Sequence, residues 1–253
     1  MAQPAARTAS DTELPQVTLT AVPAAGTVPV DPERSVGHAS HSRPAAYSPV
    51  TFQPTMYTRF IKPAIDRVAA LVAIFVLAVP MLLTGVVVAL SMGRPLLFRQ
   101  RRVGLHGNVF NVLKFRTMGQ DRRGTDQAVD EDLRLTHKTE KDPRHTPVGR
   151  FLRRFSLDEL PQLFNILCGE MSVVGPRPEL ESVVAAHYPP GLEQRHLVRP
   201  GLTGLWQISA RGDGPMHENG GWDLKYVETV SPMTDLKIVV KTPFVIFGRN
   251  AGN

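Results

Sequence analysis

The chain contains an uninterrupted run of 26 residues without a charged side chain, from Val68 to Gly93. At about 1.5 Å per residue, a helix of this length can cross the roughly 30 Å hydrocarbon layer of a bilayer. Pro80 lies in the middle of the run, where a proline removes a helix hydrogen bond and favours a bend. Such a long apolar run is not typical of a buried helix in a soluble protein, so we expect a membrane segment.

Basic residues precede and follow this run: Lys62 and Arg67 before it, and Arg94, Arg99, Arg101 and Arg102 after it. The positive-inside rule places both ends on the cytoplasmic side, whereas a single crossing would separate them. We therefore favour a re-entrant helix hairpin over residues 56–94, which enters one leaflet, bends near Pro80 and returns. A single transmembrane span is the alternative.

The net charge of +6 and the pI of about 9.8 indicate an anionic partner. Between Arg59 and Arg116 there are nine basic residues and one acid, and they flank the apolar run, which favours lipid headgroups over nucleic acid. The sequence shows no zinc site, recognition helix or aromatic RNA-binding motif, so we expect no nucleic-acid partner. The chain has a single cysteine, Cys168, so no intramolecular disulfide can form. Cys168 lies in an apolar helical segment, and we expect its thiol to be buried.

Outside the apolar run, the sequence divides into a tail and a folded region. Residues 1–55 contain eight prolines and no sustained periodicity, so we expect a disordered tail. The pieces LLFRQRRVG and NVFNVLKFRTM, separated by a His-Gly-Asn turn signal, predict a β-hairpin at 96–118. Residues 119–146 predict a mobile surface loop, and Thr146-Pro147 the start of a short basic helix.

The end of the chain, from Trp222 to Phe247, predicts two short amphipathic helices that pack on the core or lie in the headgroup layer. The expected fold is thus α/β-like and membrane-associated. It combines a re-entrant membrane helix hairpin (56–94) with a domain at 95–253, built from a small β-hairpin or sheet and several short helices, including interfacial amphipathic ones.

Chemistry is concentrated between Ser156 and Pro178, in SLDELPQLFNILCGEMSVVGPRP. Ser156 is a plausible helix cap, and Asp158 and Glu159 would then occupy the first turn of a helix, where negative charge is favoured. They could be capping residues alone. Several arginines lie nearby, however, and carboxylates, guanidinium groups and a helix N-terminus together form sites for phosphorylated substrates and divalent metals. The arginines are Arg150, Arg153, Arg154 and Arg177.

Three further residues, in two segments, are candidates for binding phosphate. Lys114 and Arg116 alternate with Phe115 and would share one face of a strand, either at a phosphate or against anionic lipid. Arg177 lies between Pro176 and Pro178, whose fixed φ angles would hold its guanidinium in place. A structural salt bridge to Glu179 or another acid is the alternative for Arg177.

Four segments resemble the bacterial sugar transferase family of monotopic phosphoglycosyl transferases: KFRTM (114–118), KDPRHTPVGRFLRR (141–154), SLDELPQLFNILCGEMSVVGPRP (156–178) and RPGLTGLWQISAR (199–211). The similarity runs from about Tyr57 to the C-terminus, and the chain resembles the short form of the family. The family's Ser-Pro pair at the bend of the re-entrant helix corresponds to Val79-Pro80. Arg211 retains a family arginine, although Ala210 replaces the usual glycine before it.

The resemblance implies an enzyme that transfers a sugar 1-phosphate from a UDP-sugar to undecaprenyl phosphate and releases UMP. This is the first membrane step of exopolysaccharide, capsule or O-antigen-type glycan assembly. It implies Mg²⁺, a covalent phosphosugar-aspartate intermediate on Asp158, and Glu159 as a metal ligand or as the residue that orients the nucleophile. Lys114, Arg116, Arg154, Arg177 and Arg211 are the expected substrate-binding residues. The expected location is the bacterial inner membrane, with the catalytic domain facing the cytoplasm and a homodimer possible. A non-catalytic membrane adaptor or a basic nucleic-acid-binding protein is the competing interpretation.

Overall fold

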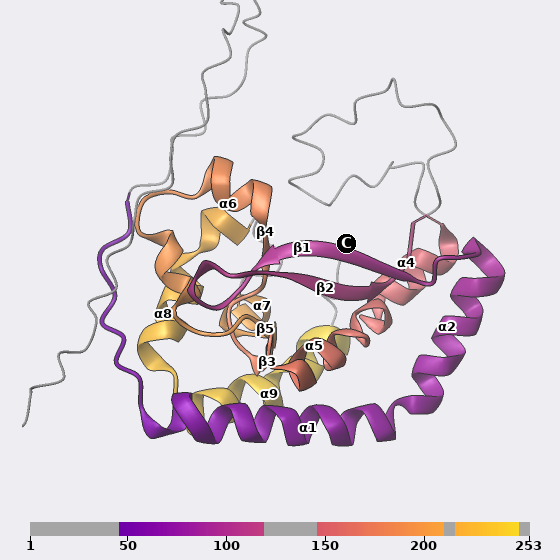
Figure 1. Cartoon of the computed structure of the whole chain (residues 1–253), viewed down its shortest axis with the longest axis horizontal. Coiled ribbons are helices and arrows are strands. Elements are labelled where there is room, and N and C mark those ends of the chain that lie inside the picture. Colours follow the sequence, from indigo (N-terminus) through magenta and orange to yellow (C-terminus); the bar gives the residue numbers. More distant parts are fainter. Residues whose placement is uncertain (1–45, 119–145, 210–215, 248–253) are drawn as a thin grey trace, which may run out of the picture. The chain divides into compact units, whose positions relative to one another are not determined.

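A computed structural model of the chain describes residues 46–118, 146–209 and 216–247, all within the compact unit Arg43–Asn253 (Figure 1). Most of the predicted N-terminal tail, almost all of the predicted loop at 119–146, and Arg211 lie outside the described residues.

The apolar run forms two helices joined at a 65° bend. A short π-helix (Tyr57–Ile61) leads into α1 (Lys62–Val76), and α2 (Ala78–Met92) follows. The bend centres on Leu77, three residues before Pro80, because Pro80 has no N–H to bond the carbonyl of Val76. The predicted bend is confirmed. Among the described helices no single one has the length and apolarity to cross a bilayer, whereas this bent pair reaches both together.

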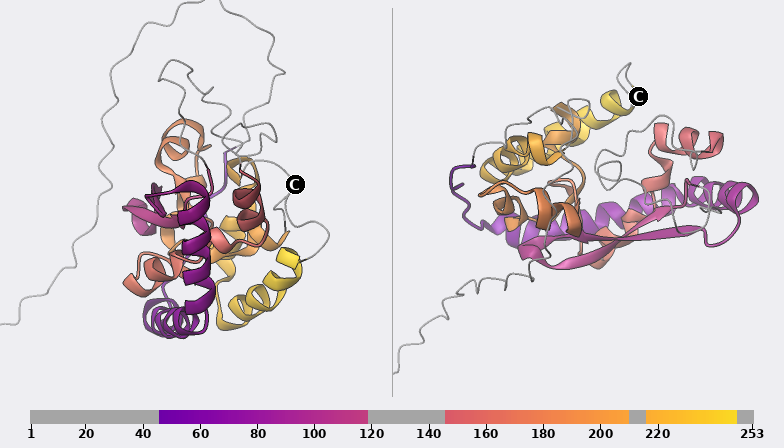
Figure 2. Two further views of the ribbon diagram at one scale, coloured as in Figure 1. Left: turned by 90° about the vertical axis from the view of Figure 1, so that its right-hand side faces the viewer. Right: turned by 90° about the horizontal axis from the view of Figure 1, so that it is seen from above.

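The predicted β-hairpin is also confirmed. Strand β1 (Leu97–Val103) pairs antiparallel with β2 (Val109–Phe115), and the chain reverses in a 3-10 turn at Leu105–Gly107. His106 and Gly107 in that turn have positive φ angles of 53° and 79°. Figures 1 and 2 show the hairpin running alongside α1 towards α2.

Two further pairings complete the sheets. The short strand β4 (Glu179–Leu180) pairs antiparallel with β1, so that the first sheet has the order β2-β1-β4. Strands β3 (Ser172–Val174) and β5 (Gly201–Thr203) form a separate parallel pair. Gly175, directly after β3, and Gly201 in β5 approach so closely that a Cβ on Gly201 would lie 2.1 Å from the Gly175 nitrogen.

The remaining elements are short helices. The predicted basic helix is α4, which begins at Pro147 and is capped by the Thr146 hydroxyl, 2.9 Å from the Gly149 nitrogen. The two predicted C-terminal helices are α8 and α9. The α-helices after the hairpin are α4 (Pro147–Arg154), α5 (Gln162–Cys168), α6 (Glu181–His187), α7 (Leu205–Ser209), α8 (Gly221–Thr229) and α9 (Pro232–Phe247). The 3-10 helices there are Leu157–Glu159, Leu192–Leu197 and Met216–Asn219.

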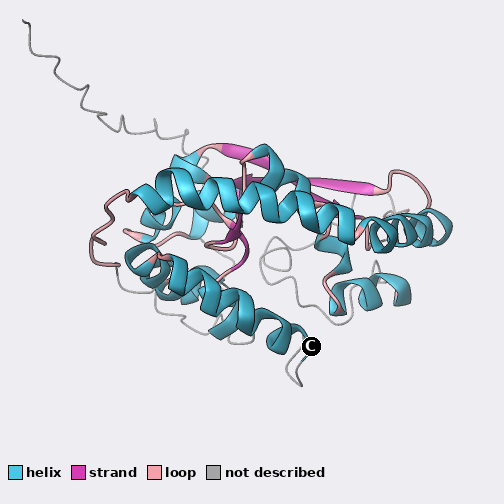
Figure 3. Cartoon of the chain, turned by 90° about the horizontal axis from the view of Figure 1, so that it is seen from below, coloured by secondary structure: helices cyan, strands magenta, loops and turns pink. Residues whose placement is uncertain are grey.

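Apolar side chains from α1, β2 and α5 form one core cluster, and residues of β3, α8 and α9 contribute to a second. Asp235 of α9 connects the two ends of the described chain. It accepts hydrogen bonds from Tyr57 (2.6 Å), Lys62 (2.6 Å) and Tyr226 (2.7 Å). Helices α1 and α9 consequently lie on the same side, towards the viewer in Figure 3. Both also carry exposed apolar residues, including Val72, Phe75, Val76, Leu236, Val240 and Phe244.

Three local expectations need correction. Residues 46–55 were assigned to the tail, but they contact the folded unit: the Tyr47 nitrogen donates to the Pro190 carbonyl (2.8 Å) and Phe52 packs against the second core cluster. Cys168 is exposed, not buried, because α5 is short and its Phe164 and Cys168 share the outer face. Ser156 is not a side-chain cap; it adopts the left-handed region at φ 55°.

Candidate active site

The acid pair occupies a 3-10 helix, Leu157–Glu159, rather than the first turn of α5. The physical reason is Pro161, which has no N–H to bond the Leu157 carbonyl, so the Leu160 nitrogen bonds that oxygen instead. The positive φ of Ser156 turns the chain from α4 into this helix, a backbone conformation that costs roughly 1–2 kcal/mol in a non-glycine residue. Such a conformation persists only where the surrounding structure fixes it, so Asp158 and Glu159 have a defined position.

Glu159 lies between two cations that are distant in the sequence. Its Oε1 is 3.1 Å from the Lys114 Nζ and 3.2 Å from an Arg177 terminal nitrogen. The proximity of Glu159 raises the pKa of the Arg177 guanidinium. The structure therefore brings together four of the predicted site residues, namely Lys114, Asp158, Glu159 and Arg177, and the partner of Arg177 is Glu159 rather than Glu179.

Asp158 differs from its neighbour because its carboxylate is buried without a direct ion pair among the described residues. It is 7% exposed, and no side-chain hydrogen bond or ion pair joins it to another residue in the part of the chain that the structure describes. Burial, followed by the adjacent charge of Glu159, raises its pKa from 3.8 to about 6, while Lys114, a hydrogen bond from the backbone N–H of Asp158 itself, and Arg153 act in the opposite direction. A buried carboxylate with a raised pKa and nearby cations is typical of a functional site.

All three backbone carbonyls of the Pro-Arg-Pro turn accept hydrogen bonds from other parts of the chain. The Pro176 carbonyl accepts from the Gly201 nitrogen (2.8 Å), the Arg177 carbonyl from Arg195 (2.6 Å), and the Pro178 carbonyl from Arg102 (3.1 Å). Arg195 is fully buried and forms an ion pair with the equally buried Asp223; Tyr188 lies 2.5 Å from its other terminal nitrogen. The backbone of Arg177 is thus fixed while its guanidinium points to Glu159.

Asn165 fastens the acid-bearing segment to the hairpin. Its Oδ1 accepts from the Leu113 nitrogen (3.0 Å), and its Nδ2 donates to the Asn111 carbonyl (2.8 Å) and to Glu170 (2.7 Å). Asn165 is 2% exposed, so these bonds are shielded from water. They place β2, and Lys114 with it, against the start of α5.

The other predicted substrate-binding residues are oriented elsewhere or lie outside the described residues. Arg116 donates to the carbonyls of Met92, Gly93 (3.0 Å) and Arg94 (3.2 Å), so it caps the C-terminal end of α2. Arg154 is exposed, and its guanidinium lies over the Phe155 ring at 5.9 Å. Arg211 lies outside the described residues.

Sequence reasoning missed Arg153, Asn165, Arg195 and Asp223 as contributors to the site. Arg153 was noted only as one of several basic residues, yet it acts electrostatically on Asp158 and donates to the Thr117 hydroxyl (3.1 Å) at the end of the hairpin. The arginines in VGRFLRRF are indistinguishable by composition, because which of them faces the acid pair depends on how α4 packs.

The chain belongs to the bacterial sugar transferase family, whose model matches residues 57–249. It is 42% identical over 198 residues to the exopolysaccharide production protein ExoY of Sinorhizobium fredii, covering 75% of this chain and 87% of that protein. It is 38% identical over 204 residues to the UDP-glucose:undecaprenyl-phosphate glucose-1-phosphate transferase of Escherichia coli, covering 76% of this chain and 41% of that protein.

A third relative is the undecaprenyl-phosphate galactose phosphotransferase of Salmonella typhimurium, which is 36% identical over 200 residues and of which 42% is covered. The family match places the chain among transferase enzymes and confirms the resemblance stated from the sequence motifs. Membership of an enzyme family disfavours both competing interpretations, the adaptor and the nucleic-acid-binding protein.

Proposed function

We propose that this protein transfers a sugar 1-phosphate from a UDP-sugar to undecaprenyl phosphate and releases UMP. The observation that carries the proposal is the buried Asp158, with its raised pKa, next to Glu159, which is itself bound to Lys114 and Arg177. The relatives support the reaction class, since two of them are named as undecaprenyl-phosphate sugar phosphotransferases.

The reaction we propose has two displacements at one phosphorus atom. In the first, an Asp158 carboxylate oxygen bonds to the β-phosphorus of the UDP-sugar while the bond from that phosphorus to the bridging oxygen breaks. UMP leaves with the bridging oxygen and its electron pair. In the second, a phosphate oxygen of undecaprenyl phosphate attacks the same phosphorus and releases the Asp158 carboxylate, which yields a lipid diphosphate sugar.

The main obstacle to this chemistry is repulsion between a carboxylate and an anionic diphosphate. The cations around Glu159 reduce this repulsion. Lys114 and Arg177 can exchange part of their contact with Glu159 for phosphate oxygens, and Arg153 adds positive potential at Asp158. Burial also removes water that would otherwise hydrolyse an acyl phosphate on Asp158.

We include Mg²⁺ in the proposal. The site fits the ion, since two adjacent carboxylates with substrate phosphates form a common magnesium donor set, and the Asp158 carboxylate has no competing described partner. Asp158 and Glu159 would hold the ion, and it would neutralise charge on the diphosphate.

The proposed location is the cytoplasmic face of the bacterial inner membrane. The 65° bend between α1 and α2, the basic residues at both ends of the pair and the exposed apolar side chains support a re-entrant hairpin. The exposed apolar face of α9, which includes Met233, Leu236 and Val240, supports an interfacial position for that helix. In such an arrangement Asp158 and Glu159 would lie near the headgroup layer of the membrane, where the phosphate of undecaprenyl phosphate is located.

The test is to look for the covalent intermediate and the lipid product separately. Purified protein in detergent is mixed with Mg²⁺ and a panel of UDP-sugars, first without undecaprenyl phosphate and then with it. Intact-protein mass spectrometry should show an adduct of one sugar phosphate that disappears on addition of the lipid, with a peptide map locating it on Asp158. A labelled lipid product without any adduct would retain the transferase but reject the covalent step, and no product with any donor would reject the function.

A further inference from the structure

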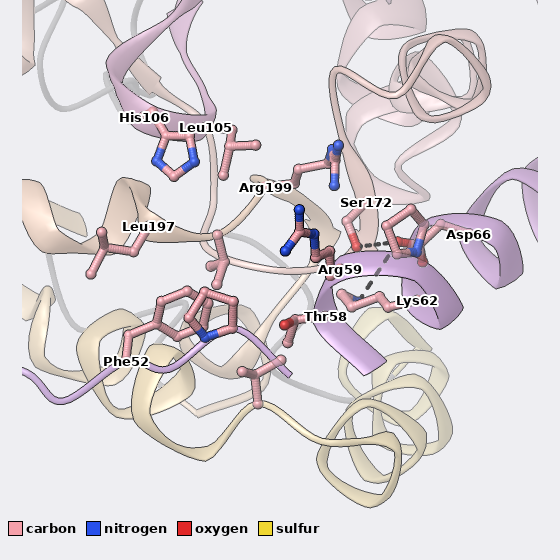
Figure 4. Close-up of a pocket in the computed structure, with 14 residues that line it drawn as sticks. Phe52, Thr58, Arg59, Lys62, Asp66, Leu105, His106, Ser172, Leu197 and Arg199 are labelled. Carbon is pink, nitrogen blue, oxygen red and sulfur yellow. Dashed lines mark hydrogen bonds and ion pairs between the residues drawn. The ribbon is translucent and has the colours of Figure 1, made fainter. Parts of the chain in front are cut away.

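A second region of the molecule has the features of an anion-binding site. A pocket of about 300 Å³, which we call the α1 pocket, opens beside the N-terminal end of α1. Its lining comes from the 46–55 segment, the π-helix, α1, the hairpin turn, the start of β3 and the chain preceding β5, with Val230 after α8. In Figure 4, Arg59 and Arg199 occupy one side of it, and Phe52 and Leu197 the other.

The two arginines of the α1 pocket have guanidinium N–H donors without a described hydrogen-bond partner. The Arg59 guanidinium makes a contact with the face of the Phe60 ring at 5.4 Å, and no ion pair joins it to any residue that the structure describes. Arg199 donates its Nε to the Gly169 carbonyl at 2.9 Å, which leaves its two terminal nitrogens without a described partner. Paired guanidinium groups with free terminal nitrogens are the usual receptors for phosphate oxygens.

Asp66 is the one acid among the described lining residues, and Asp235 pairs with Lys62 at 2.6 Å, so these two acids face three cations, Lys62 and the two arginines. Asp66 accepts from the Ser172 hydroxyl (2.6 Å) and the Val173 nitrogen (3.2 Å), and Lys62 lies 3.8 Å away. Figure 4 shows Lys62, Asp66 and Ser172 grouped at one end of the pocket. The pocket therefore retains positive charge, to which the imidazole of His106 can add a donor.

Apart from the Thr58 hydroxyl, the rest of the lining is apolar and includes Phe52, Leu105, Leu197 and Val230. Cationic donors beside an apolar wall match an anion that carries an apolar group better than a fully hydrated ion. We propose that the α1 pocket binds the phosphate group of a phosphate ester, at a site separate from Asp158 and Glu159.

The separation follows from the hairpin. His106 lies in its closed end, whereas Lys114, which contacts Glu159, lies at the far end of β2. Five residues of extended strand, about 17 Å, separate Lys114 from Val109 at the turn. The phosphate ester could be a lipid headgroup or a soluble metabolite, and the chemistry is the same for both. The proposal goes beyond the transferase reaction and does not depend on it.

The test uses the full chain in an uncharged detergent and two probes, dihexanoyl phosphatidic acid and glycerol 3-phosphate, which differ in the presence of acyl chains. Calorimetric titration should show saturable binding of phosphatidic acid to the wild type. The double variant Arg59→Gln/Arg199→Gln should bind at least tenfold more weakly. The matched control, Arg101→Gln, should stay within twofold, since Arg101 is exposed and paired with Glu181 at 2.8 Å.

A measurement on the wild type guards against a variant that fails to fold. Arginine modification by phenylglyoxal, mapped by peptide mass spectrometry, should be suppressed at Arg59 and Arg199 by the bound probe and unchanged at Arg101. If only phosphatidic acid binds and protects the two arginines, the ligand is a lipid. If both probes bind and protect them, the ligand is a soluble phosphate ester. Either result supports the phosphate site. Absence of saturable binding by both probes, or equal affinity in a folded double variant, would overturn it.

Discussion

Replacing the proposed nucleophile should make the protein more stable while it abolishes turnover. Asp158 is a buried carboxylate with no described ion-pair partner, so its ionised form destabilises the fold. In Asp158→Asn the amide keeps the shape of the side chain and cannot ionise. We therefore expect Asp158→Asn to have a higher free energy of unfolding than the wild type at neutral pH.

The magnitude and the pH range follow from the raised pKa. An ordinary aspartate loses its proton near pH 3.8, whereas Asp158 in the folded protein retains it up to about pH 6. Between these values the unfolded chain binds fewer protons than the folded one, so the free energy of unfolding of the wild type falls as the pH rises. Above pH 6 the loss is constant, and it amounts to about 3 kcal/mol.

The assay is thermal unfolding of wild type and Asp158→Asn in the same detergent, with EDTA, at pH values from 4 to 8. For a folded unit of this size, about 3 kcal/mol corresponds to roughly 6–12 °C in Tm. The advantage of the variant should develop between pH 4 and 6 and then stay level. Glu159→Gln is the contrasting control; it should lower Tm at pH 8, because it leaves Lys114 and Arg177 without their shared partner. A difference between wild type and Asp158→Asn that is the same at pH 4 and pH 8 would refute the reasoning.

Three other predictions concern the same site. Because the attacking form of Asp158 is the carboxylate, and a proton on it would compete with Mg²⁺, the Mg²⁺ concentration that gives half-maximal kcat/KM should rise as the pH falls below about 6; a Mg²⁺ requirement that is the same from pH 5 to 8 would argue against Asp158 as the titrating group. Arg195→Met should cost about 3–5 kcal/mol in the free energy of unfolding, since it leaves Asp223 buried without its partner. The double variant Arg195→Met/Asp223→Leu should recover most of that loss in denaturant titrations, and no recovery would contradict the ion-pair explanation. Asn165→Ala should destabilise by roughly 2 kcal/mol through unpaired backbone groups of β2, and unchanged hydrogen exchange at the Leu113 amide would contradict that attribution.

Local signals in the sequence explain the elements that could be predicted. The turn residues around Gly107 mark the hairpin, Thr146-Pro147 marks the start of α4, and Pro80 marks the bend, because each residue acts on its own backbone. The acid pair could be recognised for the same reason: two adjacent carboxylates followed by an apolar helix form a local pattern.

The contacts that assemble the site depend on packing between distant segments, and the sequence carries no local sign of them. Lys114 and Arg116 have the same strand periodicity, but only the first reaches Glu159, because α2 ends where the second can cap it. The buried pair of Arg195 and Asp223 joins residues 28 positions apart, and nothing in either local sequence indicates a partner. Such contacts become visible only when the helices are placed.

The most direct test of the central claim is UMP release by the purified protein with undecaprenyl phosphate, Mg²⁺ and a panel of UDP-sugars, comparing wild type with Asp158→Asn. The account predicts release by the wild type with at least one donor, and none above background by the variant, although the variant is folded and more stable. Equal release by both proteins would mean that Asp158 is not the nucleophile, and would contradict the assignment of the active site.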